Sequence, residues 1–132
     1  MRVGFTGTRE GMTAPQRATL HKLLLEFEGG EFHHGDCLGA DAEAHDIAAE
    51  LYTTVIHPPL RATCRAFKSG NVVLQKQDYL ERNKDIVDNT ALLIAAPKTL
   101  REEHRSGTWS TVRYARKNDK QVIIIYPDGS TS

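Results

Sequence analysis

Two short turns, each rich in glycine and hydroxyl residues, carry the groups of this chain that are best suited to hold an anion. Thr6-Gly7-Thr8-Arg9 follows an apolar run, and Ser106-Gly107-Thr108 precedes a stretch with a helical pattern. Glycine lets the backbone approach a ligand closely, while threonine hydroxyls and Arg9 donate hydrogen bonds. A helix N-terminus adds unpaired N–H groups and the positive end of the helix dipole. We therefore expect these two turns to bind a phosphate-type group.

Short apolar runs that alternate with helical patterns surround the two turns. Strands are predicted over residues 2–5, 31–34, 53–57, 91–96 and 122–126, and helices over residues 13–27, 40–51, 78–88 and 112–117. In the third helix, the inward side is predicted to carry Tyr79, Leu80, Ile86 and Val87. The alternation predicts a Rossmann-like, doubly wound α/β fold with a mainly parallel, five-stranded sheet in the order 3-2-1-4-5. The first and fourth strands are then neighbours at the topological switch point, so both turns face one crevice.

The composition is typical of one ordinary globular domain. Of 132 residues, 39% are hydrophobic and 26% are charged; residues 1–126 are expected to form the domain and residues 127–132 a tail. Lys plus Arg and Asp plus Glu number 17 each, so no net charge attracts nucleic acid or an anionic membrane. The sequence shows no signal peptide or membrane-spanning pattern, and only two cysteines, Cys37 and Cys64. These features predict a reduced, cytoplasmic protein.

The segment from Leu60 to Gln77 lacks a clear periodic pattern. Its charged residues are all basic: Arg61, Arg65, Lys68 and Lys76. Two interpretations remain open. The segment is either a solvated connection or a mobile basic lid over the carboxyl edge of the sheet.

Several histidines and one cysteine invite a metal-site interpretation. They are His33, His34, Cys37 and His45. Adjacent residues of a strand point to opposite faces of the sheet, so His33 and His34 are poorly placed to share one ion. We therefore predict no metal site. Trp109 follows the second turn directly and is expected to pack in the core, with stacking on a ligand as the alternative.

Four motifs, in this order, resemble the SLOG superfamily. They are Val3-Gly4-Phe5-Thr6-Gly7-Thr8-Arg9, His34-Gly35-Asp36-Cys37-Leu38-Gly39-Ala40-Asp41, Glu81-Arg82-Asn83 and Ser106-Gly107-Thr108-Trp109. That superfamily includes the LOG phosphoribohydrolases, the DprA/Smf DNA-processing proteins, the molybdenum-cofactor carriers and the YspA-like proteins. The small stand-alone YspA-like members are the most similar. The resemblance implies a Rossmann-like sheet, a nucleotide-type ligand at the crevice, and a homodimer or homotetramer.

The resemblance also extends the expected site beyond the two turns. Gly35 and Gly39 would shape a second glycine-rich turn. Asp41 would either cap the following helix or hold a ribose hydroxyl. Arg82 and Asn83 would contact the ligand or form structural bonds on their own helix.

The same resemblance bears on catalysis. In LOG enzymes the second turn reads G-G-x-G-T-x-x-E, and an arginine matched here by Arg82 works with that glutamate. The glutamate position falls on Thr111, whose hydroxyl cannot act as a base near neutral pH. Phosphate binding needs no such carboxylate, and Thr111 remains among the residues expected to contact the ligand. Arg82 is then the only catalytic candidate, and a substitute carboxylate would have to come from Asp41, Glu81 or Glu10.

Three functions follow from these observations. The favoured one is a nucleotide-binding module (a sensor, carrier or sequestering protein) that requires no cofactor besides its nucleotide-type ligand. The second is a LOG-like nucleoside-monophosphate N-glycosidase that uses a substitute carboxylate. The third, DprA-like binding of single-stranded nucleic acid, is disfavoured by the neutral charge and the few aromatic residues.

Overall fold

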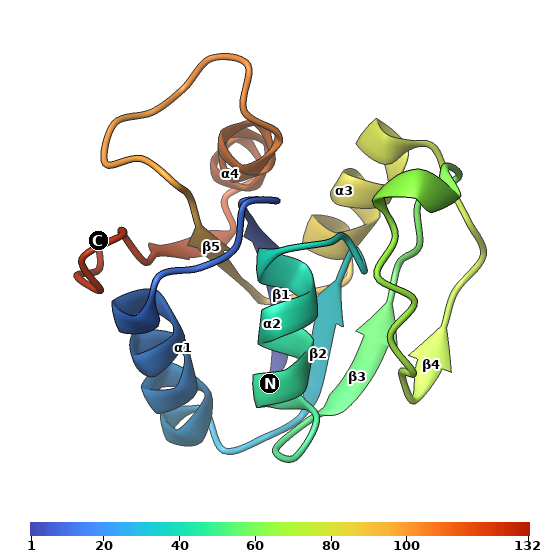
Figure 1. Ribbon diagram of the computed structural model, residues 1–132, viewed down its shortest axis with the longest axis horizontal. Coiled ribbons are helices and arrows are strands. Elements are labelled where there is room, and N and C mark those ends of the chain that lie inside the picture. The colour runs from blue at the N-terminus through green and yellow to red at the C-terminus, as the bar shows by residue number, and fades with distance from the viewer.

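The structure, a computed structural model, describes residues 1–132 as three layers, with a parallel sheet between two pairs of helices (Figure 1). The strands are β1 (Arg2–Gly7), β2 (Glu31–His34), β3 (Thr53–Ile56), β4 (Val72–Val73), β5 (Leu92–Ala96) and β6 (Gln121–Ile124). The helices are α1 (Ala14–Glu26), α2 (Ala40–Ala48), α3 (Tyr79–Asp88) and α4 (Gly107–Lys117), with a 3₁₀ turn at Ala62–Cys64. The sheet order is β4-β3-β2-β1-β5-β6.

Two hydrophobic cores hold the layers together, one on each face of the sheet. Val3, Phe5 and Phe32 pack under α1 and α2, whose contribution includes Leu20 and Leu24. On the other face the core is formed by Leu93, Ala95, Ile124 and residues of α3 and α4. Strand β5 is buried over its full length, as expected for a central strand of a parallel sheet. None of the helices combines the length and the apolar character needed to cross a membrane.

The predicted number of strands is wrong. The five expected strands occur in the expected order, but β4 adds a sixth at the edge, where Val72 and Val73 pair with Val55 and Ile56 of β3. Side-chain bonds anchor this short strand: the Thr54 N–H donates to Asn71 Oδ1 (2.9 Å), and the Asn71 N–H donates to Thr54 Oγ1 (3.1 Å). A two-residue strand with exposed side chains has no periodicity that a sequence pattern can detect.

The predicted inward face of α3 is wrong at Leu80. Ile86 and Val87 are buried as expected, but Leu80 is 58% exposed and lies in the first helical turn, beyond the sheet. The large side chain that α3 buries is instead Arg82, at 1% exposure. Because α3 begins at the carboxyl edge of the sheet, its first turn borders the candidate site rather than the core.

The chain between β3 and α3 is docked on the turn that follows β2. Asp36 is fully buried, and it accepts hydrogen bonds from Arg65 Nε (2.9 Å) and from the Lys68 N–H (3.0 Å). The Leu38 N–H also donates to the Cys64 carbonyl (3.0 Å). One basic residue of this segment, Arg65, therefore forms an ion pair with the buried Asp36.

The last residues fold back on β6 and α1. Ile124 and Ser132 exchange two backbone hydrogen bonds of 3.1 Å, and the Thr19 hydroxyl donates to the Gly129 carbonyl (2.8 Å). The segment expected to be a tail therefore contacts the domain, even though it contributes no large side chain to either core.

Candidate functional site

A cavity of about 700 Å³ opens at the carboxyl edge of the sheet, between the ends of β1 and β5 and the first turns of α3 and α4. The predicted site residues that line it are Gly7, Thr8, Arg9, Asn83, Ser106, Gly107 and Thr108. The predicted residues that do not line it are Thr6, Gly35, Gly39, Asp41, Arg82 and Thr111. The two turns expected to face one crevice therefore do so, since β1 pairs directly with β5.

The N-terminus of α4 presents open hydrogen-bond donors to this cavity. Ser106 is the N-cap, and its hydroxyl oxygen accepts from the Trp109 N–H (3.3 Å). The N–H groups of Gly107 and Thr108 come too early in the helix to have intrahelical acceptors. The Thr108 side chain is only 7% exposed, lines the cavity and forms no hydrogen bond within the chain. A hydroxyl without a partner in the chain, accessible at the cavity beside a helix N-terminus, is well placed to bind an anion.

The loop after β1 forms the opposite wall. The Thr8 N–H donates to the Ala96 carbonyl (3.1 Å), which extends the β1–β5 pairing. The Thr8 carbonyl accepts from the Ala40 N–H (2.9 Å), so α2 begins directly against this loop. Gly39 permits that approach: its φ is +89°, and a Cβ atom there would collide with the Arg9 carbonyl. Gly39 therefore shapes the wall from behind and does not reach the cavity.

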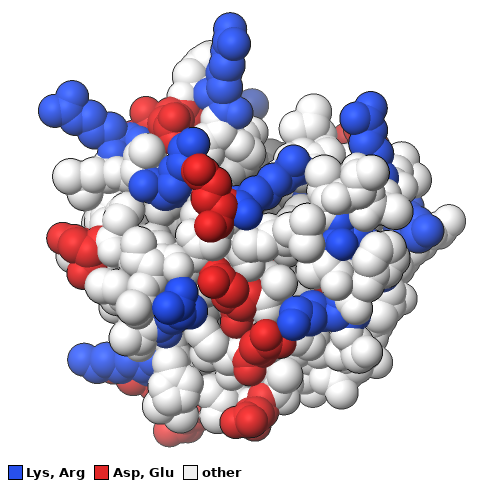
Figure 2. Space-filling view, viewed as in Figure 1, with Lys and Arg blue, Asp and Glu red and all other residues white.

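The cavity has an excess of basic groups in a chain without net charge. Arg9, Lys98, Arg105 and Arg113 line it together with only two carboxylates, Glu10 and Glu103. Lys98 pairs with Glu10 at 3.1 Å, and Arg113 pairs with Glu102 at 2.7 Å. Arg9 and Arg105 form no ion pair, so their charges are free to meet an anionic ligand. Over the face drawn in Figure 2, side chains of both signs are interspersed.

Several cavity residues were not predicted from the sequence. They are Tyr79, Leu80, Lys98, Glu103, His104, Arg105, Ser110 and Arg113; Glu10 was considered only as a substitute carboxylate. Most of them belong to residues 97–106, a loop that extends beyond the sheet (orange in Figure 1), or to the first turns of α3 and α4. The one indication of these residues in the sequence was their position, since this charged loop directly precedes the second turn.

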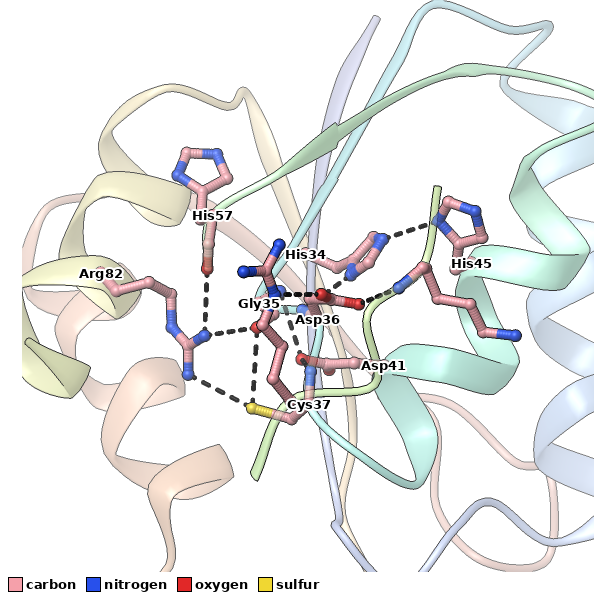
Figure 3. Close-up of polar contacts among 10 residues, drawn as sticks. His34, Gly35, Asp36, Cys37, Asp41, His45, His57 and Arg82 are labelled. Carbon is pink, nitrogen blue, oxygen red and sulfur yellow. Dashed lines mark hydrogen bonds and ion pairs between the residues drawn. The ribbon is translucent and has the colours of Figure 1, made fainter. Parts of the chain in front are cut away.

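Arg82 lies below the cavity, at the centre of a buried polar network (Figure 3). Its Nη1 donates to the carbonyls of Gly35 (2.6 Å) and His57 (3.1 Å), and its Nε donates to Asn83 Oδ1 (2.7 Å). A Cβ atom at Gly35 would collide with this guanidinium. Arg82 thus ties α3 to the ends of β2 and β3, and Gly35 provides the space for it.

Asp41 belongs to the same buried layer. Its Oδ2 accepts from the N–H groups of Gly35 (3.2 Å) and Cys37 (3.3 Å), and so holds the turn after β2 in shape (Figure 3). Burial raises the pKa of Asp41 to about 6, although the positive charge of Arg82 opposes the shift. Asp41 therefore stabilises the turn after β2. It is not the N-cap of α2, because that position is Gly39.

Thr111 lies one helical turn below the open N-terminus of α4. It is 3% exposed, and its hydroxyl donates to the Gly107 carbonyl (2.9 Å). Trp109, in the first turn of α4, is also buried and belongs to the core that includes Leu93 and Ile124, as expected of a packing residue. Of the three substitute carboxylates, only Glu10 lines the cavity, since Asp41 is buried and Glu81 is exposed elsewhere on α3.

The histidines form two separate pairs on opposite faces of the sheet. His33 Nδ1 lies 2.7 Å from His57 Nε2, and His34 Nε2 lies 2.9 Å from His45 Nδ1. The two pairs are separated because His33 and His34 are adjacent in a strand and therefore point to opposite faces of the sheet. No group of three or more potential metal ligands is found. Burial lowers the pKa of both His34 and His57 to about 3, and neighbouring histidines contribute to the shift.

Acidification is expected to destabilise the fold through these histidines. In the folded chain His34 and His57 stay neutral down to a pKa of about 3, whereas in the unfolded chain they bind protons below their ordinary value of 6.5. Stability is therefore lost as the pH falls through 6.5, by roughly 2 kcal/mol per histidine at pH 5. Asp41, whose pKa is raised to about 6, acts in the opposite sense and offsets roughly 1 kcal/mol.

Urea denaturation at pH 7 and pH 5 measures this loss. His57→Gln removes one titrating group and is expected to flatten the dependence of the free energy of unfolding on pH. Equal stability of the unchanged protein at the two pH values would contradict the prediction.

Comparisons with known proteins agree with the architecture. No protein-family model and no curated protein matches the sequence. Among solved structures, the chain is similar to the molybdenum cofactor binding protein from the phototrophic bacterium Rippkaea orientalis. The TM-score is 0.73 at 24% identity, over 95% of this chain and 76% of that one. This likeness establishes the fold: a Rossmann-like α/β protein, in which the cavity occupies the switch point between β1 and β5.

Proposed function

We propose that this chain is a binding protein for a phosphorylated small molecule of the nucleotide type. The observation that carries the proposal is the set of open donors at the N-terminus of α4, above all the hydroxyl of Thr108, which has no partner in the chain and is accessible at the cavity. A phosphate there would accept from the N–H groups of Gly107 and Thr108 and from the Thr108 hydroxyl. The free guanidinium groups of Arg9 and Arg105 would balance its charge.

Tyr79 supports the same position for the phosphate. A Cβ atom at Gly107 would lie 2.8 Å from the Tyr79 hydroxyl, so this hydroxyl is immediately beside the helix N-terminus. The Tyr79 side chain also lines the cavity, beside the Arg9 guanidinium. It therefore adds a donor from α3 to those from α4, and the phosphate would be held from two sides.

Membership of the SLOG superfamily is part of the proposal. The solved structure to which the chain is similar is that of a molybdenum cofactor binding protein, and this supports a role in binding a small molecule. A homodimer or homotetramer is also expected, and analytical ultracentrifugation measures it. The N-glycosidase alternative loses support, because Arg82 and two of its three candidate carboxylates, Asp41 and Glu81, do not line the cavity. The third, Glu10, lines it but pairs with Lys98 at 3.1 Å.

Ligand binding is tested by thermal stabilisation and calorimetry with mono- and dinucleotides, cyclic nucleotides, ADP-ribose and pterin phosphate esters, with chromatography of the same samples to detect turnover. A ligand at 100 times its Kd is expected to stabilise the fold by about 2.7 kcal/mol. Binding without product supports a binding protein, whereas release of a free base would identify an N-glycosidase. If no phosphate ester stabilises the chain, the proposal fails.

Thr108→Val is expected to weaken phosphate-ester binding on the order of tenfold to a hundredfold, since it removes one hydrogen bond to a charged group. Thr53→Val, at an exposed position of β3, is the matched control and is expected to leave the affinity unchanged. Calorimetric titration measures both Kd values. Equal affinities for the two variants would place the phosphate elsewhere.

A further inference from the structure

A second cavity, of about 490 Å³, adjoins the first, and the two share Arg9 and Tyr79 as lining residues. Tyr79 reaches both regions: its hydroxyl lies beside Gly107, and its ring borders the second cavity. The Arg9 guanidinium lies 5.1 Å from the centre of that ring. Arg9 is exposed and forms no ion pair, so a ligand ring can displace its guanidinium from the Tyr79 ring without breaking an ion pair. One ligand can therefore extend from the first cavity into the second.

The lining of the second cavity offers surface for a flat ring that carries N–H donors. Pro59, Leu60 and the Tyr79 ring provide apolar and aromatic surface, which suits stacking of a heterocycle. Asp78 places a carboxylate in the same cavity, which Arg9 and Arg61 also line, and this carboxylate forms no hydrogen bond or ion pair within the chain. Because it has no partner in the chain, the carboxylate can accept hydrogen bonds from ring N–H groups of a ligand.

We propose that the second cavity holds the heterocyclic ring of the ligand and that Asp78 selects a 2-amino-4-oxo ring edge, which guanine and pterins share. The inference rests on the proposed function, because the phosphate at α4 fixes the other end of the ligand. A carboxylate only accepts hydrogen bonds, and its two oxygens match two adjacent N–H donors. Guanine and pterins present such a pair at the ring NH and the 2-amino group. Adenine presents one amino group beside an acceptor nitrogen, which the carboxylate disfavours.

The test compares four phosphate esters by calorimetry: GMP, IMP, AMP and a pterin phosphate ester. GMP or the pterin ester is expected to bind about tenfold to a hundredfold more tightly than AMP, with IMP in between because it lacks the 2-amino group. The tighter of the two identifies a guanine nucleotide or a pterin as the ligand class. Asp78→Asn is expected to abolish the preference, while Glu81→Gln, on the same helix but outside both cavities, preserves it.

The possible failures are distinguishable. If all four esters bind equally, and Asp78→Asn changes nothing while Thr108→Val still weakens binding, the ring assignment is overturned and the proposed function stands. If none of the four esters binds, both the ring assignment and the proposed function are wrong. A melting curve without ligand checks that Asp78→Asn folds, and this exposed side chain has no bonds to lose.

Discussion

Arg82→Ala is expected to lower the free energy of unfolding by about 3–5 kcal/mol, the range found when one member of a buried, hydrogen-bonded charge network is removed. The substitution leaves the His57 carbonyl without its donor and the Gly35 carbonyl with only the Cys37 thiol, at 3.7 Å. It also removes the positive charge that stabilises the buried Asp41 carboxylate. A large void would remain at the junction of α3, β2 and β3, because the side chain is only 1% exposed.

Chemical denaturation measures this loss, and Arg105→Ala is the matched control. Arg105 is exposed at the cavity and forms no ion pair, so its replacement is expected to weaken ligand binding and leave stability unchanged. Arg82→Lys keeps a charge but cannot reach all the acceptors, and its stability is expected to be intermediate. If Arg82→Ala remained as stable as the unchanged protein and lost only ligand binding, Arg82 would be a ligand residue, as the LOG resemblance implies.

Gly107→Glu is expected to weaken the binding of any phosphate ester by about a hundredfold or more, because it places a carboxylate where the phosphate would lie. The backbone at Gly107 has no positive φ, so the substitution introduces no backbone strain. The new side chain would displace the Tyr79 hydroxyl, which is the movable end of that residue. A carboxylate in the first turn of α4 also interacts favourably with the positive end of the helix dipole. Stability is therefore expected to be kept while affinity is lost.

Gly107→Gln is the control that separates charge from bulk. It has nearly the same size as Gly107→Glu and lacks the charge, so the difference in Kd between the two variants measures the electrostatic contribution. If both variants bound as tightly as the unchanged protein, no phosphate would lie at α4. If both lost binding equally, steric exclusion alone would explain the effect.

The part of this molecule that sequence patterns predicted is the part with regular periodicity. Buried apolar runs such as Ala91–Ala96 indicated the central strands, and their alternation with helices fixed the order of five strands. The right-handed crossover of βαβ units then placed the turns after β1 and before α4 together at the carboxyl edge of the sheet. Gly7, Thr8, Gly107 and Thr108 lie together for this reason, and no pairwise contact had to be predicted.

The features that could not be predicted depend on tertiary contacts. Arg82 resembled a ligand residue by motif, but the carbonyls that hold it belong to Gly35 and His57, far away in the sequence. Strand β4 depends on the side chain of Asn71 against Thr54 rather than on its own pattern. Lys98 and Arg105 reach the cavity because of the path of an irregular loop, which no periodicity describes.

The most direct test of the central claim is a titration of the ¹⁵N-labelled protein with GMP, followed by two-dimensional ¹H–¹⁵N NMR. The proposed site predicts that the largest amide shifts occur at Gly107 and Thr108, whose N–H groups would donate to the phosphate, and that inorganic phosphate shifts the same two signals. Shifts confined to other residues, or saturable binding that leaves the Gly107 and Thr108 amides unchanged, would contradict a phosphate site at the N-terminus of α4.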